Sequence, residues 1–172
     1  MDEPILNRVQ ASGILQIELT QWLSPPPASV VDLAEWLDGG LVLRERAFRA
    51  SVEAMDVEHY RGHVVALSCS TDAILPDWAW LLVALQLKDV VVTSVAGTLR
   101  DAEREAWLWA IHDMDLQPFE DARVIIKGCA TPGNDGVSIL AAFAQRIQPH
   151  VKSLMFGEAC SSVPLYKRPS KP

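Results

Sequence analysis

Three cysteines are the residues of this chain whose chemistry and placement most clearly suggest a functional site. Cys69, Cys129 and Cys160 each follow an apolar run that is typical of a β-strand. A βα unit takes on the order of 30 residues, and the cysteines lie about two units and then one unit apart. Because parallel strands all end at one edge of a sheet, where the ligand sites of α/β proteins form, we expect the three thiols at that edge.

Three thiolates at one edge could bind a metal. Zinc takes four ligands, and Cys69, Cys129 and Cys160 need only one oxygen ligand to complete the set. Asp72 and Glu158 are the nearest candidates for that ligand or for a nearby base. The same thiolates could hold an iron–sulfur cluster. No Cys-x-x-Cys pair is present, so the spacing differs from that of a zinc ribbon or a ferredoxin. The histidines precede predicted strands or end a helix, which places them toward the opposite edge.

Two other interpretations of the cysteines stay open. In a thiol-dependent redox or nucleophilic enzyme, one cysteine would be activated at a helix N-terminus. In a non-catalytic interaction protein, the cysteines would be structural, because free cysteine packs like a small hydrophobe. The glycine-bearing loop from Gly128 to Gly136 lacks the spacing of a nucleotide-binding loop, so we expect no nucleotide cofactor. No pattern identifies a catalytic residue, and the sequence leaves open whether the chain is an enzyme.

The strands that carry the cysteines belong to a regular series beyond Gly62. Four apolar runs predict parallel strands that are covered on both faces, at Val64–Cys69, Val90–Val95, Arg123–Lys127 and Val151–Phe156. Helices are expected between them, at about 76–87, 98–112 and 137–147. This alternation predicts an α/β fold with a four-stranded parallel sheet and helices on both faces.

The order of these strands decides whether the cysteines can meet. In the order 2-1-3-4 the three cysteine-bearing strands are neighbours, at spacings of about 4.8 Å, and the cysteine-free strand lies outside them. We therefore favour this order. Residues 13–19 alternate between apolar and polar side chains, which predicts one more strand at an edge of the sheet.

The length of 172 residues and a hydrophobic content of 49% predict a single α/β domain with a full core. We expect residues 1–61 to form an N-terminal extension of strand and helix packed on this domain, and residues 164–172 to form an extended C-terminal tail. Within the extension, Pro25–Pro27 interrupts regular structure. A short helix is predicted at Asp32–Leu37 and a longer one at Arg44–Met55.

The charge of the chain bears on its partners and location. A net charge of −7 argues against a nucleic-acid partner, because phosphate binding needs a clustered basic face and basic residues gather only at Lys167, Arg168 and Lys171. No apolar run reaches the roughly 20 residues that span a bilayer. The N-terminus lacks the pattern of a signal peptide. We expect a cytoplasmic protein with no membrane partner, in which the cysteines are reduced.

The helix expected at about 98–112 suggests a homodimer. It opens on Thr98 and Asp101, which resemble a capping box. Its core face is expected to consist of Leu99, Ala102, Ala106, Trp109 and Ala110. Trp107, Leu108 and Ile111 fall outside that face, and exposed apolar surface of this kind usually marks a partner. The predicted dimer uses this helix, with the His112 end near the interface.

Four stretches that together span most of the chain carry a resemblance to a known family. They are residues 43–49 (LRERAFR), 67–80 (LSCSTDAILPDWAW), 126–129 (IKGC) and 152–165 (KSLMFGEACSSVPL). These stretches resemble the bacterial family called domain of unknown function 2480. The resemblance implies a small bacterial protein, and it brings neither an activity nor catalytic residues with it.

Overall fold

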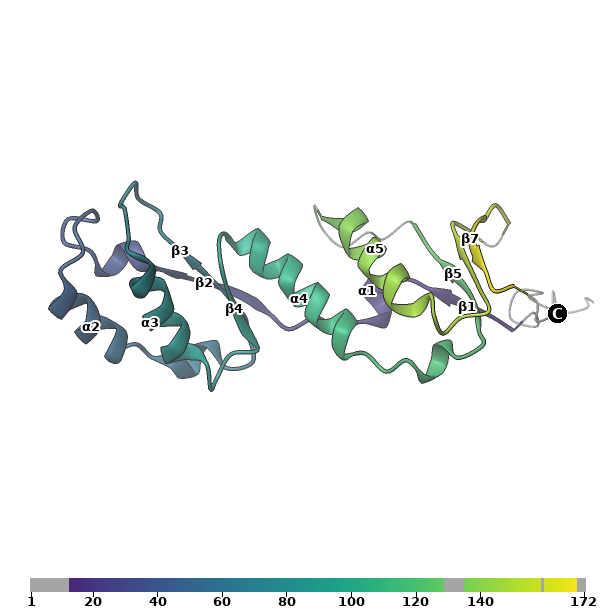
Figure 1. Cartoon of the computed structure of the whole chain (residues 1–172), viewed down its shortest axis with the longest axis horizontal. Coiled ribbons are helices and arrows are strands. Elements are labelled where there is room, and N and C mark those ends of the chain that lie inside the picture. The colour runs from purple at the N-terminus through teal and green to yellow at the C-terminus, as the bar shows by residue number, and fades with distance from the viewer. Residues whose placement is uncertain (1–12, 129–134, 159, 170–172) are drawn as a thin grey trace, which may run out of the picture. The chain divides into compact units, whose positions relative to one another are not determined.

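The structure, a computed structural model, describes residues 13–128, 135–158 and 160–169 (Figure 1). It has the mixed α/β architecture that the alternating apolar runs predict. The strands described are β1 (Ile14–Ile17), β2 (Ala28–Asp32), β3 (Val64–Ser68), β4 (Thr93–Ala96), β5 (Arg123–Ile126), β6 (Ser153–Phe156) and β7 (Val163–Lys167). The helices described are α1 (Leu19–Trp22), α2 (Glu45–Glu53), α3 (Asp77–Leu87), α4 (Leu99–Asp113) and α5 (Gly136–Ile147), with 3₁₀-helices η2 (Leu33–Trp36), η3 (Val57–Tyr60) and η4 (Gln117–Phe119).

The strands form two sheets, so the predicted single parallel sheet in the order 2-1-3-4 is wrong. One sheet has the order β2-β3-β4 and is parallel throughout. The other has the order β1-β5-β6-β7, in which β7 alone is antiparallel. Correspondingly, the chain divides into two compact units, one made of residues 25–109 and the other of the residues on both sides of that segment.

The two N-terminal strands explain why the predicted order fails. A strand has two hydrogen-bonding edges, and β3 uses both of them, one with β2 and one with β4. Likewise β5 pairs with β1 and β6. The pairing between β3 and β5 that the prediction required therefore has no free edge. The sequence analysis correctly predicted β1 as an added edge strand and missed β2.

Strand β2 was not predicted because the run Pro25–Pro27 precedes it, and proline usually interrupts regular structure. Here the prolines precede an edge strand, where a missing N–H removes no hydrogen bond of the ladder. Their carbonyls still accept: the Val64 N–H donates to the Pro27 carbonyl at 2.9 Å. The run thus leads into β2 beside the start of β3.

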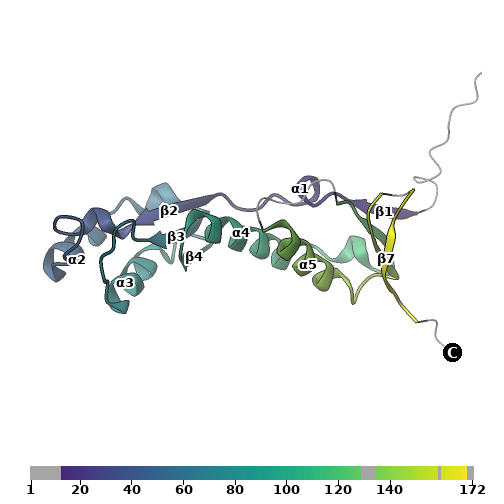
Figure 2. The same ribbon diagram turned by 90° about the horizontal axis from the view of Figure 1, so that it is seen from above.

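In the unit of residues 25–109, β3 is buried on both faces. On one face Val65 and Leu67 pack against α2 and α3, which lie side by side (Figures 1 and 2). On the other face Val64 and Ala66 pack against Ala102 and Ala106 of α4. The prediction of helices on both faces is confirmed for this sheet.

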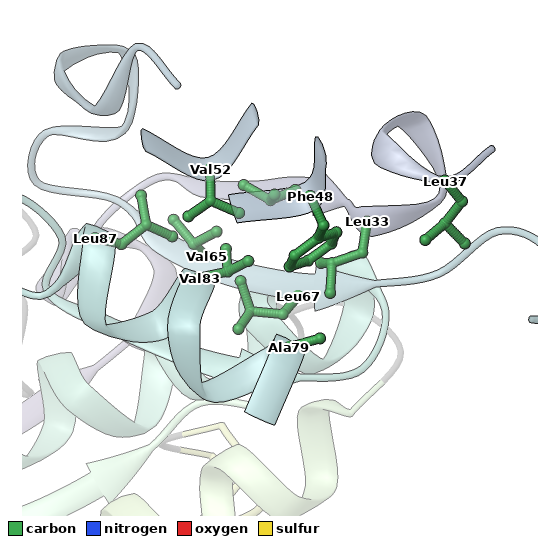
Figure 3. Packing of buried hydrophobic residues seen from close by; sticks show 10 residues of the cluster. Leu33, Leu37, Phe48, Val52, Val65, Leu67, Ala79, Val83 and Leu87 are labelled. Atoms are coloured by element: carbon green, nitrogen blue, oxygen red, sulfur yellow. The ribbon is translucent and has the colours of Figure 1, made fainter. Parts of the chain in front are cut away.

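Phe48 of α2 is the aromatic centre of the first of these clusters (Figure 3). Its side chain is fully buried. Its ring meets Trp36 of η2 edge-on at 5.8 Å and Trp78 of α3 at 5.9 Å between centroids. The Arg49 guanidinium lies over the Trp78 ring, with its Cζ atom 5.0 Å from the ring centroid. One side chain therefore connects η2, α2 and α3.

The other unit has its own aromatic core. The Phe119 ring lies 5.7 Å from Trp22 of α1 and 5.8 Å from Phe143 of α5. Val124, Ile125 and Ile126 of β5 are all buried. Successive side chains of a strand point to opposite faces of the sheet, so the burial of all three shows that β5 is covered on both faces, as the apolar run predicts.

Part of the expected C-terminal tail forms β7 instead. β7 is an edge strand whose Val163 and Leu165 are exposed, and Pro164 interrupts the short apolar segment that would predict a strand. Arg168 fixes the end of β7. Its guanidinium pairs with Asp121 and donates to the His150 carbonyl at 2.8 Å, while its own N–H donates to the Lys152 carbonyl at 2.9 Å.

Helix α4 departs from its predicted core face. Half of the predicted capping box forms: the Thr98 N–H donates to the Asp101 carboxylate at 2.8 Å, but the Asp101 N–H donates to the Thr98 carbonyl and not to its hydroxyl. However, Leu99 and Trp109 are exposed, whereas Ile111 is buried at 3% exposure. The boundary between the two units falls after Trp109, so the buried Ala102 and Ala106 belong to one unit and the buried Ala110 and Ile111 to the other. No helix in the described ranges is long and apolar enough to cross a membrane.

Replacing Phe48 by alanine should lower the free energy of unfolding by about 3–5 kcal/mol, because the cavity left in a packed core adds to the lost burial. Urea unfolding followed by circular dichroism measures the change. The matched control is Leu81→Ala on α3, whose side chain is 62% exposed and should cost less than about 0.5 kcal/mol. Equal losses in the two variants would contradict the described core.

Candidate thiol and metal site

Strands β5 and β6 bring the segments that carry Cys129 and Cys160 to one sheet edge. The two strands are parallel neighbours, and their last residues, Ile126 and Phe156, are paired. The chain leaving β6 stays attached to β5, because the Gly157 N–H donates to the Ile126 carbonyl at 2.9 Å. Cys129 follows β5 directly in sequence but lies outside the described residues. Cys160 is exposed in the loop that leads to β7.

Gly128 shows how close the two segments come. A Cβ atom on this residue would lie 2.7 Å from Cζ of Phe156, well inside van der Waals contact. The backbone just before Cys129 therefore passes directly over the ring that ends β6. Only glycine fits there unless the ring moves. This contact places the start of the Cys129 loop against the strand that leads to Cys160.

Cys160 shares a turn with a carboxylate. The Ser161 N–H donates to the Glu158 carbonyl at 2.9 Å, which closes a turn around Cys160. Gly157 enters this turn at a φ of +118°, a conformation that side chains rarely adopt. Both the Glu158 carboxylate and the Cys160 thiol are exposed. The turn thus offers an oxygen and a sulfur ligand two residues apart.

Cys69 has a different environment, in the other sheet. It follows β3 as predicted, and its Sγ lies 3.5 Å from Oγ1 and 3.6 Å from the carbonyl oxygen of Thr71. The half-buried side chain packs against the hydrophobic cluster around Phe48. Asp72 is exposed nearby. Because β3 and β5 belong to different sheets, adjacent strands do not bring Cys69 to Cys129, contrary to the expectation.

Sequence analysis missed Asp32, the residue that holds the Cys69 loop. Its Oδ1 accepts the Ala34 N–H, which caps η2, and the Ser70 N–H, both at 3.0 Å. Burial raises the pKa of this carboxyl, but the hydrogen bonds from Ser70 and Ala34 outweigh burial and hold the pKa below its usual value. An acidic residue at the end of a strand and before a helix is the signal that could have identified it.

Within the described ranges, no three His, Cys, Asp or Glu side chains lie close enough together to hold a metal. Cys129 lies outside those ranges, so metal binding stays a prediction. Two histidines do lie at the amino ends of strands, as expected. His63 hydrogen-bonds Ser29 at the start of β2, and His150 lies 2.5 Å from Glu120 before β6.

Two hollows also lie away from the cysteines. The hollow in the unit of residues 25–109 has a volume of about 700 Å³ and an acidic lining that includes Glu35 and Asp56. Burial, and then these two carboxylates, raise the pKa of Tyr60 in its wall, so this phenol stays protonated at neutral pH. The other hollow, at the amino ends of β5 and β6, has a basic lining that includes Arg123 and Lys152. Sequence analysis noticed the basic residues of the tail but missed these two.

Comparison with known proteins assigns the family. A family model described as "Protein of unknown function (DUF2480)" matches residues 3–168. The chain belongs to the DUF2480 family. This confirms the resemblance seen in the sequence. Comparisons with curated proteins and with solved structures give no match. The function of this DUF2480 chain is therefore argued from its own residues.

Replacing Asp32 by asparagine should lower the free energy of unfolding by about 1 kcal/mol at neutral pH, because two backbone N–H groups lose a charged acceptor. The folded-state pKa of Asp32 is lowered, so its contribution is present above the unfolded pKa, about 4, and is lost as the pH falls through the folded value. Urea unfolding across a pH series measures this.

The matched control is Asp72→Asn in the same loop, since Asp72 is exposed and makes no hydrogen bond or ion pair with the described residues. Its effect should be small and should vary little with pH. A loss in Asp32→Asn that stays constant from neutral pH down to below about 3 would contradict the proposed role of the carboxylate.

Proposed function

We propose that this DUF2480 chain binds zinc at the carboxyl edge of β5 and β6. Cys129 and Cys160 would supply thiolates, and Glu158 would supply an oxygen ligand. The observation that carries the proposal is the close approach of the two segments, through the pair Ile126–Phe156 and the contact of Gly128 with Phe156. Two thiolates, one carboxylate and a water complete the four ligands that zinc takes.

Zinc fits this donor set better than an iron–sulfur cluster. Clusters are usually held by four thiolates, whereas zinc accepts carboxylate and water in place of sulfur. Only two of the three cysteines of the chain follow the strands of this sheet. Glu158 lies in the same turn as Cys160, so one loop supplies two ligands of different chemistry.

The role of Cys69 decides what kind of zinc site this is. Three protein ligands leave a position for water, as in catalytic zinc sites, while a fourth protein ligand, here the Cys69 thiolate, would close the site, as in structural ones. Cys69 and Asp72 lie in the loop after β3, and the contacts described for Cys69 are with Thr71 and the hydrophobic cluster. We propose the open site, with Cys129, Cys160 and Glu158 as its ligands.

Metal analysis of protein purified without a histidine tag tests this proposal. The parent should contain close to one zinc per chain. Cys129→Ser and Cys160→Ser should each lose most of it, because thiolate ligands dominate the affinity for zinc. Cys69→Ser is the matched control and should keep its zinc.

Loss of zinc in all three variants would restore the predicted three-cysteine site and contradict the open one. A parent without zinc, even after refolding with the metal, would contradict both.

A dithiol is a second candidate function, favoured by the exposure of Cys160 and by the contact of Gly128, which precedes Cys129, with Phe156 of β6. Two such thiols could form a disulfide by giving two protons and two electrons to an oxidant such as oxidised glutathione. In a glutathione redox buffer, reversible oxidation of these two cysteines with Cys69 left reduced would support this function. Oxidation that includes Cys69 equally would count against it.

We also propose that the protein is a cytoplasmic homodimer that associates through α4. Trp109 is 39% exposed on this helix, and an exposed tryptophan is a common anchor of protein interfaces. Light scattering at micromolar concentration should give the mass of a dimer for the parent. Trp109→Lys should shift it to a monomer, while Leu81→Lys on α3 should not. A monomeric parent would contradict the proposal.

A further inference from the structure

A basic groove lies at the amino ends of β1, β5 and β6, at the edge of the sheet opposite to the carboxyl ends of these strands. It has a volume of about 960 Å³. Four basic residues line it, Arg123, Lys152, Lys167 and Arg168, with Asp121 as the one acidic residue of its lining. The lining therefore carries a net positive charge in a chain whose net charge is −7.

Sheet register holds this charge in place. Arg123 on β5 pairs with Ser153 on β6, and Ser153 pairs with Lys167 on β7. Paired residues point to the same face of a sheet, and adjacent strands are about 4.8 Å apart. The backbones of Arg123 and Lys167 are thus about 10 Å apart, with the Ser153 hydroxyl between them. Two cations and a hydroxyl group converge from three strands.

Three of the four cations have no polar side-chain partner among the described residues. Arg168 is already paired with Asp121, but Arg123, Lys152 and Lys167 make no side-chain hydrogen bond or ion pair with the described residues. Lysine on an edge strand such as β7 can serve to prevent aggregation. That explanation does not cover Arg123, which opens β5 in the interior of the sheet.

The remaining lining is apolar and aromatic. Ile14 of β1, Met155 of β6 and Tyr166 of β7 border the same groove. We propose that this groove binds a small phosphorylated ligand of nucleotide size, with its phosphates on Arg123, Lys152 and Lys167 and its less polar body on Ile14 and Met155. Three cations without an ion pair among the described residues match the multiple charge of a diphosphate better than that of a single carboxylate.

Calorimetric titration of the full chain with pyrophosphate, ADP and octanoate tests the proposal. Pyrophosphate should bind, ADP should bind more tightly, and octanoate should bind least. Arg123→Gln and Lys167→Gln should each weaken ADP binding about tenfold, and the loss should diminish at high salt, where charges are screened. Arg46→Gln on the exposed face of α2 is the matched control and should leave the affinity unchanged.

Binding of none of the three probes would overturn the proposal, as would an equal loss in Arg46→Gln. Octanoate binding as tight as that of pyrophosphate would overturn the assignment to phosphate. Equal affinities for pyrophosphate and ADP would overturn the role given to Ile14 and Met155. Circular dichroism spectra that match the parent would show that the variants are folded.

Discussion

Each sheet of this protein depends on a central strand that is hydrogen-bonded on both of its edges. β3 pairs with β2 and β4, and β5 pairs with β1 and β6. A strand has no third edge, so these pairings fix two sheets and determine which loops can share a site. Cys69 follows a strand of one sheet, whereas Cys129 and Cys160 follow strands of the other.

The parallel part of the β1-β5-β6-β7 sheet separates two kinds of chemistry along its strands. At the carboxyl ends, Gly128 crosses Phe156 and the Cys160 turn carries a carboxylate, which suits a metal or a dithiol. At the amino ends, Arg123 and Lys152 face solvent in a basic groove. The buried core of β5 lies between these ends. Because backbone pairing positions both ends, each site depends on the same strand register.

The sequence predicted most of the elements but not their pairing. Apolar runs identified β3, β5 and β6, and the capping residues Thr98 and Asp101 identified the start of α4. Strand pairing depends on contacts between segments far apart in the chain, and local sequence patterns do not reveal such contacts. β2 was missed because a proline run precedes it, and β7 was missed because an edge strand needs no buried side chains.

The sequence likewise predicted some residues of the candidate site and missed others. Cysteines after strands were correctly located at Cys69 and Cys160, and the error about Cys69 follows from the missed strand β2. Asp32 and the basic groove were missed because their roles arise from tertiary contacts. The Asp32 carboxylate at the end of β2 accepts the Ser70 N–H in the loop after β3. Arg123 of β5 lies near Lys167 of β7 because both strands pair with β6.

The most direct test of this account is which cysteines can reach one another in the native protein. Brief oxidation of the reduced, metal-free chain, followed by peptide mass spectrometry, identifies the disulfides that form. Because β5 and β6 are neighbours and β3 belongs to the other sheet, the account predicts Cys129–Cys160 as the main product, with Cys69 left as a free thiol. A main product that joins Cys69 to Cys129, with Cys160 free, would contradict it.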